Sequence, residues 1–319
     1  MHTSFRSAIR VLIGDFSFTL GVTARKPSRT SGSVAGVVAC LLLASCSHSE
    51  KKAEVTQRPL SPELKAVVID KPVVLRLLAE KDRVEKVDYL HESSAKAYVE
   101  NQLRHEKDES VEFSSQAATI SVSEPDASGI ISFVQDLSIT RKDGVANLHD
   151  FAMPDLGETL RVSMNSLGKI LKSGDYPSNS IYYVPSISLP ATPVSVGDTW
   201  AMEASWLSLN DMVPYQLSMV TILKGFLECG VDTCADLEVS GEVKFQGPLA
   251  KEMRFNSIWQ GRIYFALKSG TVVWSRTHTE ERVVAEAARR DVNSCFEALL
   301  SEPTDYKLPN LTKPTCGTR

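Results

Sequence analysis

Apolar and polar residues alternate one by one along much of this chain. The clearest stretch is residues 237–245, Leu-Glu-Val-Ser-Gly-Glu-Val-Lys-Phe. Two further sets of apolar residues share a parity along the chain: Phe255, Trp259, Ile263, Phe265 and Leu267, and Ile131, Phe133, Leu137 and Ile139. Successive side chains of an extended strand point to opposite faces, so this period of two predicts half-buried strands with one face on a core.

Turn signals separate these runs at hairpin spacing. The triplets at 142–144, 166–168, 173–175 and 268–270 all end or centre on glycine, which supplies the positive φ of tight turns. We therefore predict an all-β fold of about ten to twelve strands. The expected architecture is a single large curved antiparallel sheet with few short helices, forming an open or closed barrel, with a sandwich as the alternative. Residues 94–106 and 280–290 fit either a helix or a strand with a charged face.

The predicted β domain spans residues 67–300 and is followed by a Pro-rich C-terminal tail at 301–319. No Gly/Ser linker divides this region, which favours one domain, and a split near Pro185 to Pro193 is the alternative.

An apolar stretch of eleven residues, 34–44, lies between a basic flank and a polar segment near the N-terminus. Arg25, Lys26 and Arg29 precede it, and Ser45 and Cys46 follow it. A basic flank, a short apolar core and small residues at the break are the parts of a secretory signal. The core is too short to cross a bilayer unaided.

The sequence Leu43-Ala44-Ser45-Cys46 resembles the lipobox of bacterial lipoproteins. The resemblance implies a signal peptide at 1–45, cleavage between Ser45 and Cys46, and acylation of Cys46, so that membrane lipid is a partner. Residues 46–66 then form a flexible tether. Ser47 replaces the aspartate that retains such proteins in the inner membrane, which favours the outer membrane within the cell envelope. The alternative is a buried cysteine in a short core helix.

Composition excludes several classes of protein. The 319 residues are 43% hydrophobic and 23% charged, which is ordinary for a globular chain and excludes collagen-like, coiled-coil and wholly disordered proteins. No apolar run approaches the roughly 18 residues of a membrane-spanning helix. The formal net charge of -4 provides no basic field, so we expect no nucleic-acid partner.

Four cysteines remain beyond Cys40 and Cys46. They are Cys229, Cys234, Cys295 and Cys316. An even number in an exported chain predicts two disulfides, and pairing nearest neighbours is the most economical of three arrangements. Free thiols and a zinc site are the alternatives, but neither a histidine nor a second close cysteine pair completes four ligands. We expect no metal and no cofactor.

Residues 189–200 read Leu-Pro-Ala-Thr-Pro-Val-Ser-Val-Gly-Asp-Thr-Trp. This resembles a motif of uncharacterised β-rich bacterial lipoproteins, and an early hairpin around 80–82 fits that group without its usual Lys-Gly turn. The resemblance implies a curved sheet similar to the half-barrel of lipoprotein carriers, and it brings no activity. Physically, the motif is a structural device: Pro190 and Pro193 hold the chain extended, Gly197 and Asp198 form a turn, and Trp200 anchors the next strand.

No catalytic motif appears in the sequence, and we expect no enzymatic activity. The histidines after the lipobox are spaced apart and fit surface or strand positions: His48, His91, His105, His149 and His278. A polar stripe at Arg276, His278, Glu280 and Arg282 shares the parity of Trp274 and fits a solvated outer face better than a cavity lining. We therefore expect a lipid-anchored envelope protein that binds an apolar ligand or lipid, with a structural partner that docks to another envelope protein as the alternative.

Overall fold

The fold is almost entirely β, as predicted. A computed structural model describes residues 64–208, 213–247, 250, 253–303 and 316 of the chain. Twelve strands join in a single antiparallel sheet, which confirms the expected all-β class with one large curved sheet. The strands are β1 (Ala66–Val67), β2 (Val84–Val99), β3 (Gln102–Val122), β4 (Ser132–Gly144), β5 (Thr159–Asn165), β6 (Ile170–Ser173), β7 (Thr199–Leu207), β8 (Pro214–Glu228), β9 (Thr233–Phe245), β10 (Arg254–Ala266), β11 (Thr271–Ala285) and β12 (Ala288–Glu302). Two short 3-10 turns are η1 (Leu148–Phe151) and η2 (Ile181–Tyr183).

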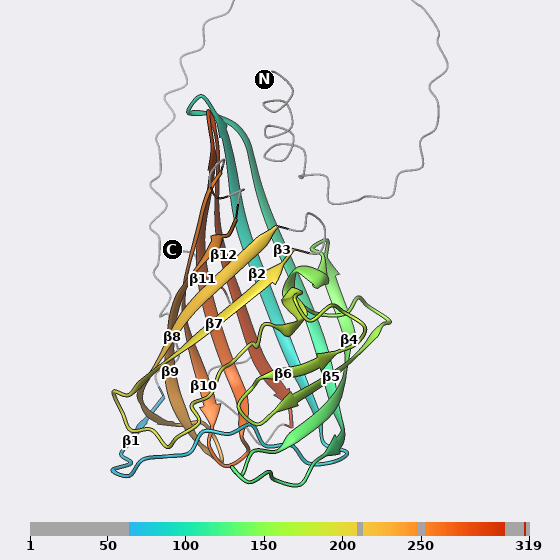
Figure 1. The fold of residues 1–319 in the computed structure, drawn as a ribbon, viewed down its shortest axis with the longest axis vertical. Helices are drawn as coiled ribbons and strands as arrows, with labels where there is room; N and C mark the ends of the chain where they lie inside the picture. The colour runs from blue at the N-terminus through green and yellow to red at the C-terminus, as the bar shows by residue number, and fades with distance from the viewer. Residues whose placement is uncertain (1–63, 209–212, 248–249, 251–252, 304–315, 317–319) are drawn as a thin grey trace, which may run out of the picture.

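The strand order is β1-β8-β9-β10-β11-β12-β2-β3-β4-β5-β6, with β7 beside β1 on the same edge of β8. β12 pairs with β2, so the last strand joins the two halves of the sheet. Among the described residues this path does not return to its start, and the sheet is curled without closing into a barrel. Figure 1 shows β7 and β8 passing in front of β11, β12 and β2.

The predicted alternation separates two faces of the curled sheet. On β10, Phe255, Trp259 and Ile263 point to the inner face, whereas Asn256 and Ile258 between them are exposed outside. Two crossing segments, residues 64–80 and 184–198, cover the lower part of the inner face. Their buried side chains Leu75, Ile187, Leu189 and Val194 pack against Leu223, Leu237, Ile263 and Phe265 of the sheet. This layer forms the main core of the protein.

Two regions whose sequence fits either a helix or a strand form strands in the structure. Residues 94–106 end β2 and begin β3, and residues 280–290 end β11 and begin β12. Both hairpins extend beyond their neighbours at the top of Figure 1. The early turn, by contrast, does not belong to a hairpin, because the chain from 74 to 80 is irregular and only β2 follows it. Asp82 adopts the positive φ of 66° that the missing glycine would supply.

The strand boundaries differ slightly from the predicted domain limits. β1 begins at Ala66, the last residue assigned to the tether, and Lys65 already forms an ion pair of 2.8 Å with Glu228. β12 continues to Glu302, into the predicted tail. The predicted signal peptide and nearly all of the predicted tether lie outside the described residues.

The Pro190 to Trp200 motif ties a crossing segment to the sheet. Arg76 donates hydrogen bonds to the carbonyl oxygens of Pro190 and Ala191, at 2.7 and 2.6 Å. The carboxylate of Asp198 accepts from the backbone N–H of Ser195 at 2.8 Å, closing the turn that contains Gly197. The indole N–H of Trp200 donates to the carbonyl of Ser188 at 2.7 Å, and its ring packs on the main core. The polar groups of the motif are therefore used inside the fold.

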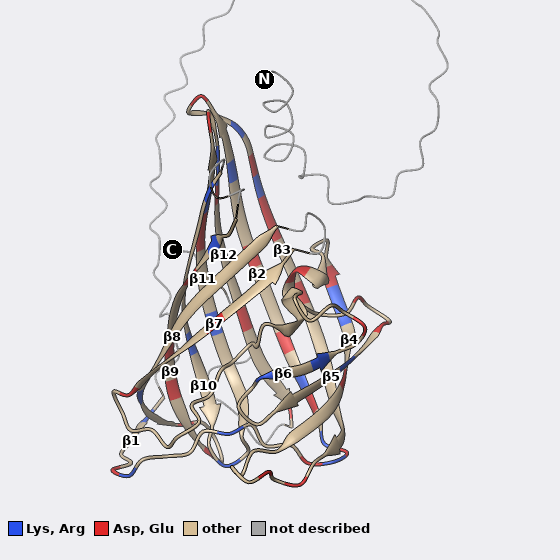
Figure 2. Ribbon diagram, viewed as in Figure 1, with Lys and Arg blue, Asp and Glu red and all other residues tan. Residues whose placement is uncertain are grey.

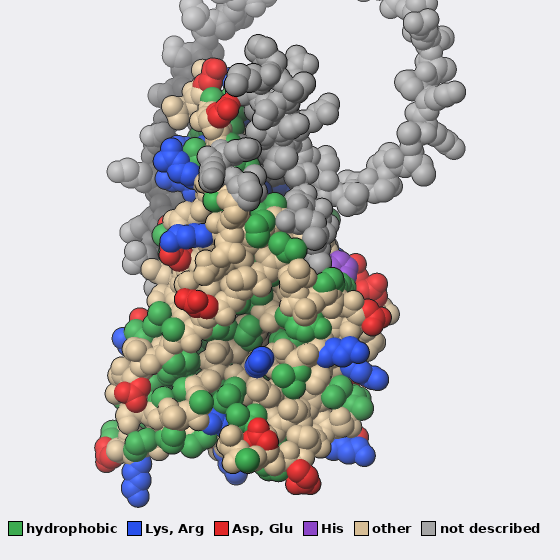
Figure 3. Space-filling model, in the orientation of Figure 1, with side chains coloured by type: hydrophobic (Ala, Val, Ile, Leu, Met, Phe, Trp, Pro, Cys, Tyr) green, Lys and Arg blue, Asp and Glu red, His purple; other side chains and the backbone are tan. Residues whose placement is uncertain are grey.

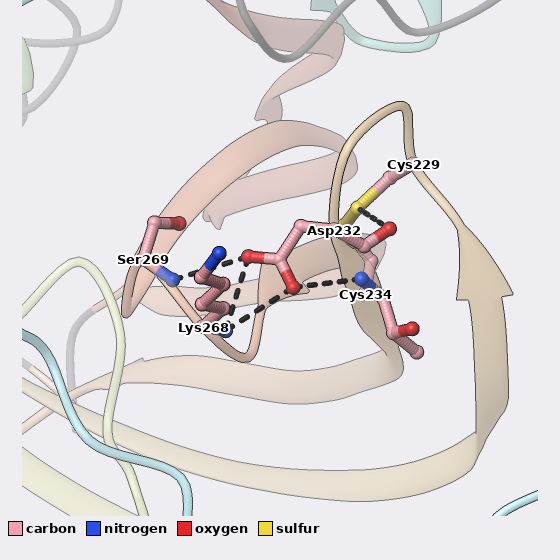
Figure 4. The surroundings of a disulfide bond; sticks show 6 residues. Cys229, Asp232, Cys234, Lys268 and Ser269 are labelled. Carbon is pink, nitrogen blue, oxygen red and sulfur yellow. Dashed lines mark hydrogen bonds between the residues drawn. A yellow bond between two sulfur atoms is a disulfide. The ribbon is translucent and has the colours of Figure 1, made fainter.

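Two disulfides join nearest-neighbour cysteines, Cys229 with Cys234 and Cys295 with Cys316. The first closes the loop between β8 and β9. Within this loop the carboxylate of Asp232 accepts hydrogen bonds from the backbone N–H groups of Lys268, at 3.0 Å, and Ser269, at 3.1 Å (Figure 4). One side chain thus fastens the disulfide loop to the turn between β10 and β11.

Gly270 in that turn offers a test of the packing against a crossing segment. Its φ is +61°, and an added Cβ would lie 2.5 Å from Leu78 Cγ and 2.6 Å from the carbonyl oxygen of Arg76. We expect Gly270→Ala to lower the free energy of unfolding by about 3 kcal/mol, since strain and overpacking add. The control is Gly129→Ala, where φ is +73° and no atom lies within 4 Å, which isolates strain at about 1 kcal/mol. Equal losses in urea unfolding would show that the contact with Leu78 is unimportant.

Candidate functional site

The site residues predicted from the lipobox, Ser45 and Cys46, lie outside the described part of the chain. The four remaining cysteines form disulfides, and the residues of the Pro190 to Trp200 motif hold the fold together. Neither group presents free chemistry to a ligand, so the candidate site must be sought elsewhere on the sheet.

An aromatic wall lines the inner face above the main core. It consists of Trp206 on β7, Tyr215 on β8, Phe245 on β9, and Phe255 and Trp259 on β10. Tyr215 stacks on Trp206 at 5.3 Å between ring centroids and meets Phe255 edge-on at 5.6 Å. Phe245 stacks on Phe255 at 4.5 Å. The rings therefore form a continuous apolar surface that extends across four strands.

The aromatic wall is less covered than the core below it. Each of its five rings is half-buried, and so is the neighbouring Met219, whereas Leu223 and Phe265 in the main core are fully buried. The crossing segments account for this difference, because they cover the lower inner face and reach the wall only at Val184. Of the four strands that carry the wall, β7 and β8 bear the least charge, with Glu203 on β7 and Lys224 and Glu228 on β8 (Figure 2). The other two strands carry more: Asp236, Glu238, Glu242 and Lys244 on β9, and Arg254 and Arg262 on β10.

The inner face becomes polar away from the wall. Cross-strand pairing places Thr279 of β11, Ser294 of β12 and Ser93 of β2 level with Trp259. Glu281 lies one step further along β11, opposite Ser257. Glu109 of β3 pairs with Ser93 and so lies on the same face, where it forms an ion pair with Lys107. The inner face is thus amphipathic from one side of the sheet to the other.

Three ionisable groups on this face have pKa values shifted toward the neutral form. Burial raises the pKa of Glu281 above that of a free glutamate, with Arg290 opposing the shift. Burial lowers the pKa of His91, which Glu109 partly offsets, and raises the pKa of Tyr89 to about 12. Loss of hydration is the largest cause of all three shifts, so these positions have a low effective dielectric constant. Glu281 lies four residues along β11 from Thr277, which is level with His91, so these two groups do not converge on one reacting atom.

The predicted polar stripe on the outer face differs from expectation at Arg276. The structure buries this guanidinium, which donates to the fully buried carboxylate of Glu297 at 2.7 Å through Nε. The indole N–H of Trp274 donates to the other oxygen of Glu297 at 2.9 Å. Arg276 is therefore not a solvated residue, because the Glu297 carboxylate and the Trp274 ring cover it. The carboxylate is already satisfied by its neighbours and is unsuited to hold a ligand.

Residues from one loop region have the composition of a metal site. His149, Asp155 and Glu158 place one potential ligand atom each within 4.8 Å of one another. The sequence offered no signal for this group, because the three residues lack the spacing of the common metal motifs and His149 fitted an ordinary surface position. The aromatic wall, in contrast, could have been found from strand parity once Phe255 and Trp259 were placed on one face.

Comparisons with known proteins do not identify a family. No family model matches the sequence, and no curated protein matches it. Among solved structures, DynF from the dynemicin biosynthesis pathway of Micromonospora chersina is 7% identical, with 78% of this chain and 95% of that chain covered and a TM-score of 0.21. An outer membrane channel from Pseudomonas putida F1 is 8% identical, with 76% of this chain and all of that chain covered, again at 0.21. Likeness this low carries no functional argument. Among the described residues, no helix is long and apolar enough to cross a membrane.

The buried Arg276–Glu297 pair predicts a large cost when one partner is removed. We expect Glu297→Leu to lower the free energy of unfolding by about 3–5 kcal/mol, because it leaves a buried guanidinium without its counter-ion. The double variant Arg276→Met with Glu297→Leu should recover part of that loss. Glu106→Gln is the control, since its pair with Lys96 is exposed to solvent and should contribute little to stability. Urea unfolding measures all three, and a similar small loss for both single variants would contradict the assignment.

Proposed function

We propose that this chain is a lipid-anchored protein of the bacterial cell envelope, in the outer membrane rather than the inner, and that its curled sheet binds an apolar ligand on the inner face. The observation that carries the binding proposal is the aromatic wall. Five rings and Met219 form an apolar surface that the crossing segments leave half-buried. Surfaces of this kind contribute about 25 cal/mol for each Å² removed from water, so an apolar ligand that covers them gains affinity.

The chemistry of the inner face favours a fatty acyl chain as the ligand. The aromatic wall supplies apolar contacts, and the neighbouring row of Thr279, Ser294 and Ser93 supplies hydroxyls for a polar end group. The shifted pKa values of Glu281 and His91 indicate that burial disfavours charge at these two positions. We propose binding without catalysis, because these two ionisable groups lie at different levels of the sheet and do not form an acid–base pair.

Adjacent residues on β8 provide a matched test of ligand binding. Met219 lies on the inner face beside the wall, whereas Val220 is 42% exposed on the outer face. We expect Met219→Glu to weaken binding of the fluorescent fatty acid cis-parinaric acid by about tenfold or more, equivalent to about 1.4 kcal/mol, because it places a charge against the acyl chain. Val220→Glu should bind like the parent protein.

A second variant protects this test against simple loss of folding. Trp259→Ala removes contact area from the wall without adding a charge, and it should also weaken binding while the circular dichroism spectrum stays that of a β protein. No binding by the parent protein, or equal affinity of both glutamate variants, would refute an inner-face site.

The lipid anchor has its own test at Cys46. When the full chain is expressed in a bacterial host supplied with radiolabelled palmitate, we expect incorporation into the parent protein and none into Cys46→Ser. Cys40→Ser is the matched control, because Cys40 lies inside the apolar core of the signal and should not affect labelling. Label retained by Cys46→Ser would reject the lipobox assignment.

The open edge of β7 supports a second candidate, a structural partner that docks to another envelope protein. Among the described strands, β7 pairs only with β8, and its other edge has a single bridge between Leu207 and Ser180. Ala201, Glu203 and Ser205 are exposed along this strand, so a strand from another protein has access to its free backbone groups. Figure 3 shows hydrophobic side chains spread over the face on which β7 and β8 lie. Mass spectrometry of the natively purified protein distinguishes the candidates by whether lipid or a protein partner co-purifies.

A further inference from the structure

The loop between β4 and β5 folds back on itself and brings three metal-ligating side chains together. Asn147 caps η1 by accepting a hydrogen bond from the backbone N–H of His149 at 3.2 Å, and Ala152 ends the turn in the left-handed region with φ 56°. A second turn follows, in which the backbone N–H of Asp155 donates to the carboxylate of Glu158 at 3.2 Å. These two local turns place both carboxylates beside the His149 ring.

The separation of two of the three ligand atoms fits one small cation. His149 Nε2 lies 3.3 Å from Asp155 Oδ2, and one atom of each of the three residues lies within 4.8 Å of the others. Two ligands held about 2.0–2.1 Å from a tetrahedral zinc ion are about 3.3 Å apart. The pair therefore already has the separation that a shared ion requires.

Hydrogen bonds outside the cluster set the orientation of the His149 ring. The Tyr182 hydroxyl lies 2.5 Å from Nδ1 of His149 and 3.1 Å from the carbonyl oxygen of Met153, and the Tyr176 hydroxyl lies 3.4 Å from the same nitrogen. Tyr182 is buried and stacked on Tyr176 with 3.7 Å between ring centroids, which holds its hydroxyl in place. A metal ion on Nε2 requires the tautomer with the proton on Nδ1, and the Tyr182 oxygen is placed to accept that hydrogen bond while its own proton goes to the Met153 carbonyl.

In that tautomer the Nε2 lone pair faces the Asp155 carboxylate, an arrangement that requires a positive charge between the two atoms. A proton on Nε2 or a metal ion satisfies the requirement equally well for the single contact with Asp155. The second carboxylate, from Glu158, favours the metal ion, because two carboxylates and a neutral imidazole balance a divalent charge. A hydrogen-bond partner at the second ring nitrogen, as Tyr182 is here, is also the usual companion of a metal-bound histidine.

We propose that His149 Nε2 and the carboxylates of Asp155 and Glu158 bind a divalent transition-metal ion of the zinc class. Nitrogen and carboxylate ligands in this ratio suit zinc, and three protein ligands leave one coordination position. Glu158 is exposed, so that position faces solvent and accepts water or a donor atom of a further ligand.

The site also has a structural consequence for the inner face. Leu148 and Phe151 of η1 pack on Val111, Phe113 and Ile139 of β3 and β4. A bound ion would fix the segment that follows η1 to the residues that precede β5, and through Tyr182 to η2. Metal binding should therefore stabilise the cover over this part of the sheet, independently of any ligand at the aromatic wall.

Zinc titration of the chelator-treated full chain tests the proposal. We expect isothermal calorimetry to show a single zinc ion per chain, and the melting temperature to rise when zinc is added. Asp155→Asn and His149→Gln should each weaken zinc binding by about tenfold or more. Asp143→Asn is the control, since this carboxylate is exposed at the end of β4 and lies outside the cluster.

Nitrogen-15 spectra of the histidine side chains provide a readout that does not depend on stability. With zinc, the Nε2 resonance of His149 should shift while Nδ1 keeps its proton. If Nε2 is protonated and zinc leaves it unchanged, the contact with Asp155 is a simple ion pair and the proposal is wrong. Zinc binding that survives both ligand variants would also overturn it, because the ion would then be elsewhere on the protein.

Discussion

A sheet of twelve strands has two faces, and the one on its inner side must be covered from water. Among the residues that the structure describes, the cover comes from irregular chain, not from a second sheet or from helices: the two crossing segments supply Leu75, Ile187, Leu189 and Val194 to the core. The two segments are joined to each other by the paired backbone hydrogen bonds between Val73 and Val194, and to the sheet by the bond from Gly197 N–H to the Leu223 carbonyl. The extent of these segments decides which part of the inner face is core and which part stays half-buried as the aromatic wall.

The Pro190 to Trp200 motif connects the covering segments to the sheet. It lies at the point where the second crossing segment enters β7, and Arg76 of the first segment binds its carbonyl groups. The motif therefore joins both covering segments to the sheet edge. The polar groups of the motif are used in hydrogen bonds within the fold, so they are not available for catalysis or ligand binding. The motif instead fixes the point at which the second crossing segment ends and β7 begins.

Strand parity and turn chemistry made much of the fold predictable. The alternation in 237–245 and the glycines near 144 and 270 correspond to β9 and to the ends of β4 and β10. Parity also placed Phe255, Trp259 and Ile263 on one face. Parity could not show how deeply a side chain is buried. Arg276 has the parity of an outer residue, but its burial depends on Glu297, which is distant in sequence. The grouping of His149 with Asp155 and Glu158 was equally hidden, because it depends on the Asn147 cap and on Tyr182 from η2.

The pairing of β12 with β2 has a consequence for how the chain is made. β2 to β6 form one half of the sheet from the first part of the sequence, and β8 to β11 belong to the other half, so only the last strand connects them. A chain that emerges from its N-terminus cannot join its halves until nearly every residue has arrived. Contacts of such long range close slowly, and until then the unjoined edges of β2 and β11 can pair with other chains. Any truncation before residue 288 would leave that seam permanently open.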